Sequence, residues 1–111
     1  MLRQKDLILL PYPFTDQGGS KVRPAIIVSN EEFNKKCPDF IVVPLTSVIK
    51  DEPYSLIINQ ENMQEGELIK QSRARLDKIF TIDKDIIIMK IGRLNEATFN
   101  KIKQEISKIF N

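Results

Sequence analysis

The sequence predicts a small, strongly bent antiparallel β-barrel with one helix packed on it. Two observations lead there. Several short apolar runs of strand length, separated by turn residues, occupy the chain up to about residue 91. The hydrophobic period then changes to that of a helix. A length of 111 residues suits one modest core, so we expect a single domain over residues 1–111 that is mainly β.

The first two strands come from apolar runs bounded by prolines and glycines. Leu7 to Leu10 is a continuous apolar run, and we expect Pro11 and Pro13 to end its regular pairing. A turn that tolerates positive φ follows at Gly18 to Ser20. The second strand is expected at about Pro24 to Ser29, because its centre is apolar and β-branched.

A short helix is expected between the second and third strands. Asn30 can cap a helix over Glu31 to Lys36, which has acidic residues at its start and lysines at its end. The third strand, Phe40 to Leu45, follows the break at Cys37 to Asp39. Pro44 predicts an edge position or a bulge in that strand.

The second half of the chain predicts four further strands and a terminal helix. The strands are expected at Tyr54 to Ile58, from Leu68-Ile69, over Ser72 to Phe80, and over Ile86 to Ile91, which Gly92 closes. The stretches Asn59 to Glu67, with a turn at Gly66, and Thr81 to Asp85 are interpreted as polar links. Helical spacing of Phe99, Ile102, Ile106, Ile109 and Phe110 predicts one amphipathic helix over Asn95 to Phe110, with Asn95 as its N-cap.

Composition excludes several classes of function. There are 17 basic and 15 acidic residues, so a polyanionic partner must be bound by a local patch and not by net charge. The single Cys37 excludes an internal disulfide, and the absence of histidine excludes a Cys–His zinc site. No clustered Asp/Glu spacing predicts a metal site or cofactor. The run Leu7 to Leu10 is too short for a membrane span, so we expect a cytoplasmic protein.

Three polar clusters are expected at the ends of strands. The first is Ser20, Lys21 and Arg23, where Pro24 favours extended backbone at Arg23. A guanidinium held there could bind a phosphate, and the alternative is a surface ion pair. The second is Thr46-Ser47, whose hydroxyls could donate to a phosphate oxygen or satisfy a nearby backbone group at the turn.

The third cluster is the most basic segment of the chain. On a strand, Arg73, Arg75 and Asp77 alternate and share one face, with Lys70 and Lys78 nearby. Three charged side chains on one face do not belong in a core, so we expect them to line solvent, a groove or a partner subunit. A phosphate-binding face and a solvated face with an Arg–Asp pair both remain open.

Five blocks of the chain resemble a known family. They are Leu10 to Asp16, Lys21 to Asn30, Pro44 to Ser47, Arg75 to Ile79 followed by Thr81 to Lys84, and Lys90 to Leu94. In this order, over nearly the whole chain, they are similar to the MazF/PemK-like toxins, the endoribonuclease half of bacterial type II toxin–antitoxin pairs.

This resemblance implies an SH3-like barrel with a C-terminal helix, assembled as a homodimer. It also implies metal-independent, often sequence-specific cleavage of single-stranded RNA to 2′,3′-cyclic phosphate and 5′-hydroxyl ends, and inhibition by a cognate antitoxin. Arg23 matches the catalytic arginine of the family, Thr46 its partner hydroxyl, and Arg75 and Asp77 an Arg-x-Asp pair with acid and base roles. We expect further contacts to RNA from Ser20, Lys21, Ser47, Lys70 and Arg73.

Some members use a histidine in the first loop, which corresponds here to Asp16 to Ser20. This chain has no histidine, so Asp77 is the candidate base. The alternative function is a non-catalytic module that binds RNA or protein, because relatives with this fold include a gyrase-poisoning toxin.

Overall fold

The computed structural model describes residues 1–12 and 21–111, and of Tyr12 and Lys21 it describes only the backbone. The strands are β1 (Asp6–Tyr12), β2 (Lys21–Ile27), β3 (Asp39–Thr46), β4 (Ser55–Ile58), β5 (Met63–Gly66), β6 (Ser72–Arg75), β7 (Phe80–Asp83) and β8 (Met89–Leu94). The helices are α1 (Glu31–Lys36) and α2 (Glu96–Phe110), and the 3₁₀ turns are η1 (Gln60–Asn62) and η2 (Lys84–Ile86).

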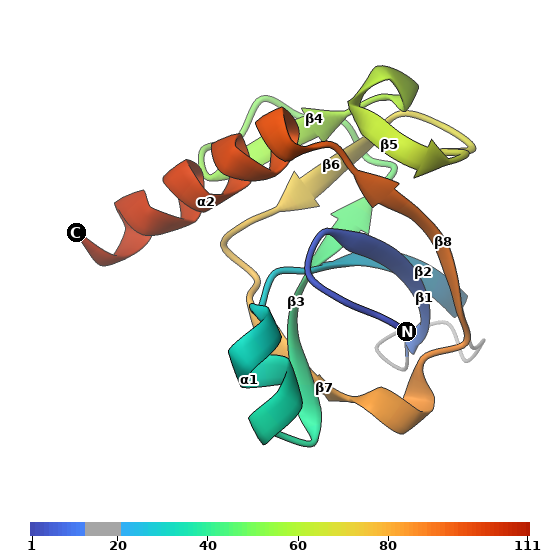
Figure 1. The fold of residues 1–111 in the computed structure, drawn as a ribbon. Helices are drawn as coiled ribbons and strands as arrows, with labels where there is room; N and C mark the ends of the chain where they lie inside the picture. The colour runs from blue at the N-terminus through green and yellow to red at the C-terminus, as the bar shows by residue number, and fades with distance from the viewer. Residues whose placement is uncertain (13–20) are drawn as a thin grey trace.

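The described strands form one antiparallel sheet that curls into a half-barrel (Figure 1). Neighbouring strands pair in the order β4, β6, β3, β2, β1, β8, β5, and β7 pairs with the first half of β3. Helix α2 lies across β6 and β4, at the opposite end of the molecule from α1 and β7 (Figure 1). The predicted bent antiparallel barrel with a C-terminal helix is therefore confirmed.

The central strands are buried on both faces, which explains why their sequences are continuous apolar runs and not alternating ones. In β1, Leu7 belongs to the core under α2, whereas Ile8 belongs to a second core that includes Phe40. In β2, Ile26 and Ile27 divide between the two cores in the same way. Successive side chains of a strand point to opposite faces, so each strand supplies both cores.

Both predicted helices are confirmed, with their caps. The side chain of Asn30 accepts a hydrogen bond from the backbone N of Phe33 at 2.9 Å, and Asn95 accepts one from Thr98 at 2.8 Å. Each bond satisfies one of the free N–H groups of a helix start. In the described part of the chain, no helix combines the length and the apolar character that crossing a membrane requires.

The single strand predicted over Ser72 to Phe80 is wrong. The chain turns at Leu76 and Asp77, where the Leu76 N–H donates to the Tyr54 carbonyl at 3.0 Å. Strands β6 and β7 both pair with β3, along different halves of it. The alternation of charged residues runs on through this turn, so the pattern conceals it. The predicted polar link Thr81 to Asp85 is accordingly wrong, since β7 and η2 cover it.

Three boundaries around β5 and β8 differ from prediction. The polar stretch before Glu67 contains η1 and β5, and no strand begins at Leu68-Ile69. Strand β5 is polar because it is an edge strand with mostly exposed side chains, so its pairing with β8 outweighs its composition. Gly92 lies inside β8 and does not close it. The position requires glycine because β5 approaches closely: a Cβ there would lie 2.7 Å from the Glu65 carbonyl oxygen.

The expectations for two prolines are also corrected. Pro11 stays paired with Val22, so β1 extends beyond the predicted end. Pro44 lies in a central strand and not at an edge: it pairs with Ala25 of β2. On its other side β3 pairs with β7 up to Val42 and with β6 from Leu45, so Pro44 falls in the gap between these two partners.

Candidate functional site

A wide groove crosses the junction of β2, β3, β6 and β7, and we call it the basic groove. Its volume is about 820 Å³. The residues that line it are Arg23, Pro44, Leu45, Thr46, Val48, Lys50, Arg73, Arg75, Lys78, Ile79, Phe80 and Thr81. Five of these side chains are cationic, and no described lining residue is acidic. A groove with this charge attracts an anion such as a phosphate.

Arg23 reaches the basic groove from the middle of β2. Its backbone is fixed by pairing with Leu10 of β1, and Pro24 holds it extended. The residue is half-buried, so its guanidinium meets the groove from a rigid strand. The sequence prediction differs in one respect: it starts the second strand at Pro24 and ends it at Ser29, whereas β2 runs from Lys21 to Ile27 and therefore includes Arg23.

Thr46 closes β3 and forms part of a compact turn. Its Oγ1 accepts a hydrogen bond from the Val48 N–H at 3.1 Å, and Arg73 Nε donates to the Val48 carbonyl at 3.1 Å. Thr46 and Arg73 are also paired in register between β3 and β6. Thr46 therefore makes the contact to a nearby backbone group that the sequence offers as the alternative to phosphate binding. Because this contact uses an oxygen lone pair, the hydroxyl hydrogen can still donate into the groove.

The expectation that Arg73 is too polar for burial is wrong. Arg73 is only 4% exposed, although it lines the basic groove. The hydrogen bond to Val48 compensates for its burial, and its Nη2 lies 4.0 Å from a carboxylate oxygen of Glu52. A buried arginine needs such partners. Arg73 therefore forms part of the groove wall and holds the turn that carries Thr46.

Arg75 and Asp77 form the pair that the sequence suggests, but in a different arrangement. Asp77 lies in the turn after β6, and its Oδ2 accepts a hydrogen bond from Arg75 Nη2 at 3.2 Å. Asp77 is not among the residues that line the basic groove, whereas Arg75 is. The buried Nε of Arg75 has no partner within the described residues. The hydrogen bond to Asp77 thus uses one nitrogen of the Arg75 guanidinium, at the edge of the basic groove.

A second, smaller groove adjoins the first, and we call it the apolar groove. Its volume is about 370 Å³. The residues that line it are Leu9, Val22, Arg23, Pro24, Leu45, Ser47, Glu67, Leu68, Ile69, Lys70, Ser72 and Ile91. Arg23 and Leu45 line both grooves and therefore lie between them.

The structure distributes the predicted site residues over these two grooves. The basic groove brings together Arg23, Thr46, Arg73 and Arg75. Ser47 and Lys70 line the apolar groove instead. Ser20 lies outside the described residues, and the Lys21 side chain is not described either.

Sequence reasoning missed Lys50 as a groove residue. It lies in a polar loop after β3, and no pattern in the sequence shows that this loop folds back over the groove. Its Nζ lies 3.9 Å from Glu52, the same carboxylate that approaches Arg73. Lysines in loops are common, so only the fold identifies this one.

Over residues 1–12 and 21–111, no three His, Cys, Asp or Glu side chains gather where they could hold a metal ion. The hydrogen bond with Lys90 lowers the pKa of Glu65, and the hydrogen bond with Lys5 lowers the pKa of Glu96. Neither glutamate lines a groove in the described structure.

Comparisons with known proteins agree on one family. Residues 3–110 match the model of the PemK-like, MazF-like toxins of type II toxin–antitoxin systems. The chain is 32% identical over 100 residues to an endoribonuclease MazF of Staphylococcus epidermidis, covering 87% of this chain and 81% of the relative. It is 28% identical over 109 residues to an endoribonuclease MazF of Staphylococcus saprophyticus, covering 96% and 88%.

A solved structure shows the same fold. It is an endoribonuclease from a mycobacterial species in complex with its cognate antitoxin, with a TM-score of 0.74. Its sequence is 21% identical, and the match covers 99% of this chain and 95% of that one. At this identity the likeness supports the fold and not the chemistry.

Proposed function

Since the chain belongs to the family of PemK-like and MazF-like toxins of type II toxin–antitoxin systems, we propose that it is an endoribonuclease that cleaves single-stranded RNA without a metal ion. The observation that carries this proposal is the basic groove. Arg23, Arg75 and Thr46 converge there from three different strands or strand ends. Such a groove can hold a phosphodiester and stabilise negative charge that develops on it.

The proposed reaction is an internal transesterification. The 2′-oxygen of the ribose attacks phosphorus and gives up its proton. The bond from phosphorus to the 5′-oxygen then breaks, and that oxygen takes up a proton. The products are a 2′,3′-cyclic phosphate and a 5′-hydroxyl, so no water is consumed in this step. The groove binds the phosphate oxygens as they gain charge in the phosphorane-like transition state.

In this scheme the two arginines and Thr46 have separate tasks. Arg23 forms hydrogen bonds with the non-bridging oxygens, and Arg75 contributes the donors that Asp77 does not use. Thr46 donates its hydroxyl hydrogen while its oxygen stays bonded to the Val48 N–H. Thr46→Ser should therefore keep most activity, whereas Thr46→Val should lose it.

Asp77 has two possible roles, as base or as the group that orients Arg75. Its position outside the lining of the basic groove supports the orienting role. If Asp77 only orients Arg75, Asp77→Asn keeps most activity because an amide oxygen can still accept from the guanidinium. If it is the base, Asp77→Asn loses activity and changes the dependence of rate on pH. Comparing rate–pH profiles of Asp77→Asn and the parent chain distinguishes the two.

A second candidate function is RNA or protein binding without cleavage. The observation that favours it is the composition of the basic groove, where no described lining residue is a carboxylate and the chain has no histidine. Such a groove would bind a polyanion tightly even if no side chain removed the 2′-proton.

One assay separates the two functions. The purified protein is incubated with single-stranded RNA in EDTA, and the ends of any products are mapped. Our proposal predicts cleavage with 2′,3′-cyclic phosphate and 5′-hydroxyl ends. Retained RNA binding without any cleavage would support the binding module instead, and cleavage that appears only after a divalent metal is added would refute metal independence.

We further propose a cognate antitoxin, a homodimeric state and a cytoplasmic location. A segment of the antitoxin rich in acidic and apolar residues would cover the groove near Arg23, Arg73 and Arg75, because its carboxylates complement these cations. The test is co-purification with the product of the neighbouring gene. Equal affinity for an Arg73/Arg75 double variant would contradict this site, and a monomer in sedimentation at micromolar concentration would contradict the dimer.

A further inference from the structure

We propose that the apolar groove is a subsite for one nucleobase next to the cleaved phosphate, and that Glu67 selects a base carrying an amino group over uracil. This inference rests on the proposed function, because it uses the phosphate position at Arg23. It adds a specificity-determining residue and a base preference to that function. This inference starts from the fact that the two grooves adjoin and share Arg23 and Leu45 as lining residues.

Arg23 connects the grooves. It lines both of them, so a phosphate bound by its guanidinium lies at the boundary between the basic and the apolar groove. A base lies one sugar away from its phosphate, and the same nucleotide can therefore place its phosphate on Arg23 and its base in the apolar groove. The volume of about 370 Å³ is sufficient for one base.

The walls of the apolar groove suit the flat face of a base. Val22, Leu68, Ile69 and Ile91 supply aliphatic surface on several sides. The side chain of Ile69 is almost completely exposed, at 96%, which leaves a large apolar group in solvent until a ligand covers it. Covering exposed apolar surface is favourable, and a base offers a face without charge.

Glu67 is held in a defined position by Gln60. The Gln60 side-chain amide donates to the Gly66 carbonyl at 3.1 Å and accepts from the Leu68 N–H at 2.7 Å. These two bonds fix the backbone on both sides of Glu67. Gly66 adopts φ +85° and approaches β8 so closely that a Cβ would lie 2.3 Å from the Ile91 carbonyl oxygen. The loop is therefore organised before any ligand binds.

A carboxylate at this place needs an explanation. Among the described residues that line either groove, Glu67 is the single acidic one. It would repel a phosphate, so it does not serve the backbone of RNA. An ionised carboxylate only accepts hydrogen bonds. Adenine, cytosine and guanine each offer an amino group with two N–H donors, whereas uracil offers only its N3–H, between two carbonyl oxygens that repel a carboxylate. Glu67 therefore favours amino-bearing bases and disfavours uracil.

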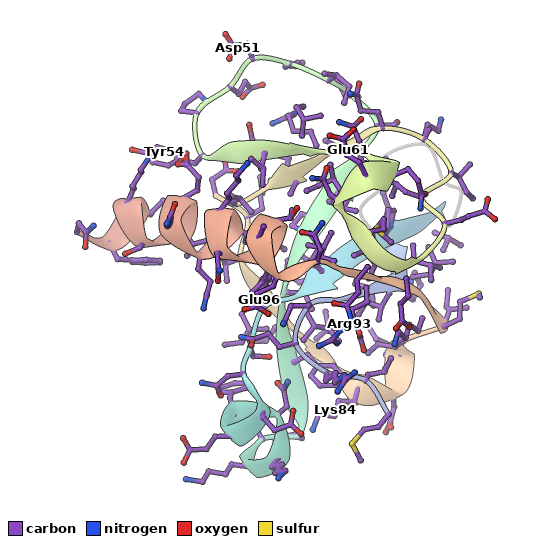
Figure 2. All side chains as sticks on the ribbon, turned by 45° about the horizontal axis from the view of Figure 1, so that its top comes forward. Asp51, Tyr54, Glu61, Lys84, Arg93 and Glu96 are labelled. Atoms are coloured by element: carbon purple, nitrogen blue, oxygen red, sulfur yellow. The ribbon has the colours of Figure 1, made fainter. Side chains whose placement is uncertain are left out.

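The test uses a pool of short single-stranded RNAs of random sequence, cut in EDTA and sequenced at the new ends. The parent chain should discriminate against uracil at one position beside the cut. Glu67→Gln should reduce that discrimination about tenfold, because a glutamine amide can also donate to a uracil oxygen. Glu61→Gln is the matched control: Glu61 is an exposed glutamate in η1 outside both grooves (Figure 2). Its base preference should equal that of the parent.

Ile69→Ser provides an independent readout. It should raise KM and leave both kcat and the discrimination against uracil largely unchanged, because it removes apolar cover from the base but no hydrogen bond. Cleavage without any bias against uracil, or a Glu67→Gln variant with the bias of the parent, would overturn the inference. So would a result in which both variants weaken antitoxin binding and leave base preference unchanged, since the groove would then serve the antitoxin.

Failure of the proposed catalysis gives a different result. If no RNA is cut, the pool retained by the protein is sequenced instead. A bias against uracil in that pool that Glu67→Gln removes would support the base subsite without cleavage. A retained pool without this bias would overturn the subsite as well.

Discussion

Removing the carboxylate of Asp6 should destabilise the fold by about 3–5 kcal/mol. Asp6 is fully buried at the start of β1, at 0% exposure. Its Oδ1 accepts a hydrogen bond from Arg93 of β8 at 3.0 Å and lies 3.4 Å from Lys90 Nζ. Its Oδ2 accepts from the backbone N of Arg3 at 2.9 Å. Asp6 thus ties the N-terminal segment and β1 to β8, on the part of the sheet that supports the apolar groove.

The size of this destabilisation depends on which cation is left without a partner when the Asp6 carboxylate is removed. Lys90 is partly exposed and keeps Glu65 at 3.1 Å, so it contributes little to the loss. Arg93 is 7% exposed, and without Asp6 its remaining described acceptor is the Gln4 carbonyl at 3.0 Å (Figure 2 labels Arg93 on β8). A guanidinium that is almost buried and has no counter-charge destabilises the folded state strongly, as in any buried ion pair that has lost one partner.

Urea unfolding at neutral pH measures this penalty. Asp6→Ala should lower the free energy of unfolding by the stated amount, whereas Glu105→Ala, on the partly exposed surface of α2, should change it by less than about 1 kcal/mol. The double variant Asp6→Leu/Arg93→Met should be more stable than Asp6→Ala, because no buried charge remains unpaired. A loss below about 1 kcal/mol in Asp6→Ala would refute this reasoning.

Three further perturbations test the supports around the grooves. The hydrogen bond and charge of Lys90 lower the pKa of Glu65. This pair therefore stabilises the fold at pH values above the ordinary glutamate pKa of about 4.3. The stabilisation is lost as the pH falls through the lowered pKa. Glu65→Gln should therefore flatten the acid-side fall in unfolding free energy, and an unchanged fall would contradict this. Lys84, which Figure 2 labels beside α1, donates to the carbonyl of the α1 C-cap Cys37 at 2.9 Å. Lys84→Met should therefore cost about 1–3 kcal/mol and speed amide hydrogen exchange in α1, whereas unaltered exchange would disagree. Gly66→Ala should lose more than about 1 kcal/mol, since φ is +85° and its Cβ would meet a carbonyl of β8; an unchanged thermal midpoint would argue otherwise.

Local chemistry made much of the fold predictable. The continuous apolar run of β1 and the helical period of α2 each point to one structure, and Asn30 and Asn95 mark both helix starts. The turn at Leu76 was hidden, because Arg73, Arg75 and Asp77 keep a strand-like alternation through it. Only the pairing of β6 and β7 with different halves of β3 imposes that turn.

The candidate site was predictable where a residue lies on or at the end of a strand. Arg23 was found because it directly precedes Pro24 and an apolar run, and Arg75 because it alternates with Arg73 and Asp77; the fold brings both arginines into one groove. Lys50 and Glu67 could not be found, because each lies in a loop whose course no sequence pattern reveals. Around Glu67 the loop is held by the side chain of Gln60, through the backbone of Gly66 and Leu68, and no sequence pattern connects these residues.

The most direct test of the account is the rate of RNA cleavage by Arg23→Ala under single-turnover conditions in EDTA. Arg23 lines both grooves, so removal of its guanidinium should lower the rate by about 10²- to 10³-fold while the thermal midpoint stays that of a folded chain. Arg3→Ala, an exposed arginine outside both grooves, is the matched control and should cleave at the parent rate. An Arg23→Ala variant that cleaves within a few-fold of the parent would place the reaction elsewhere and contradict the account.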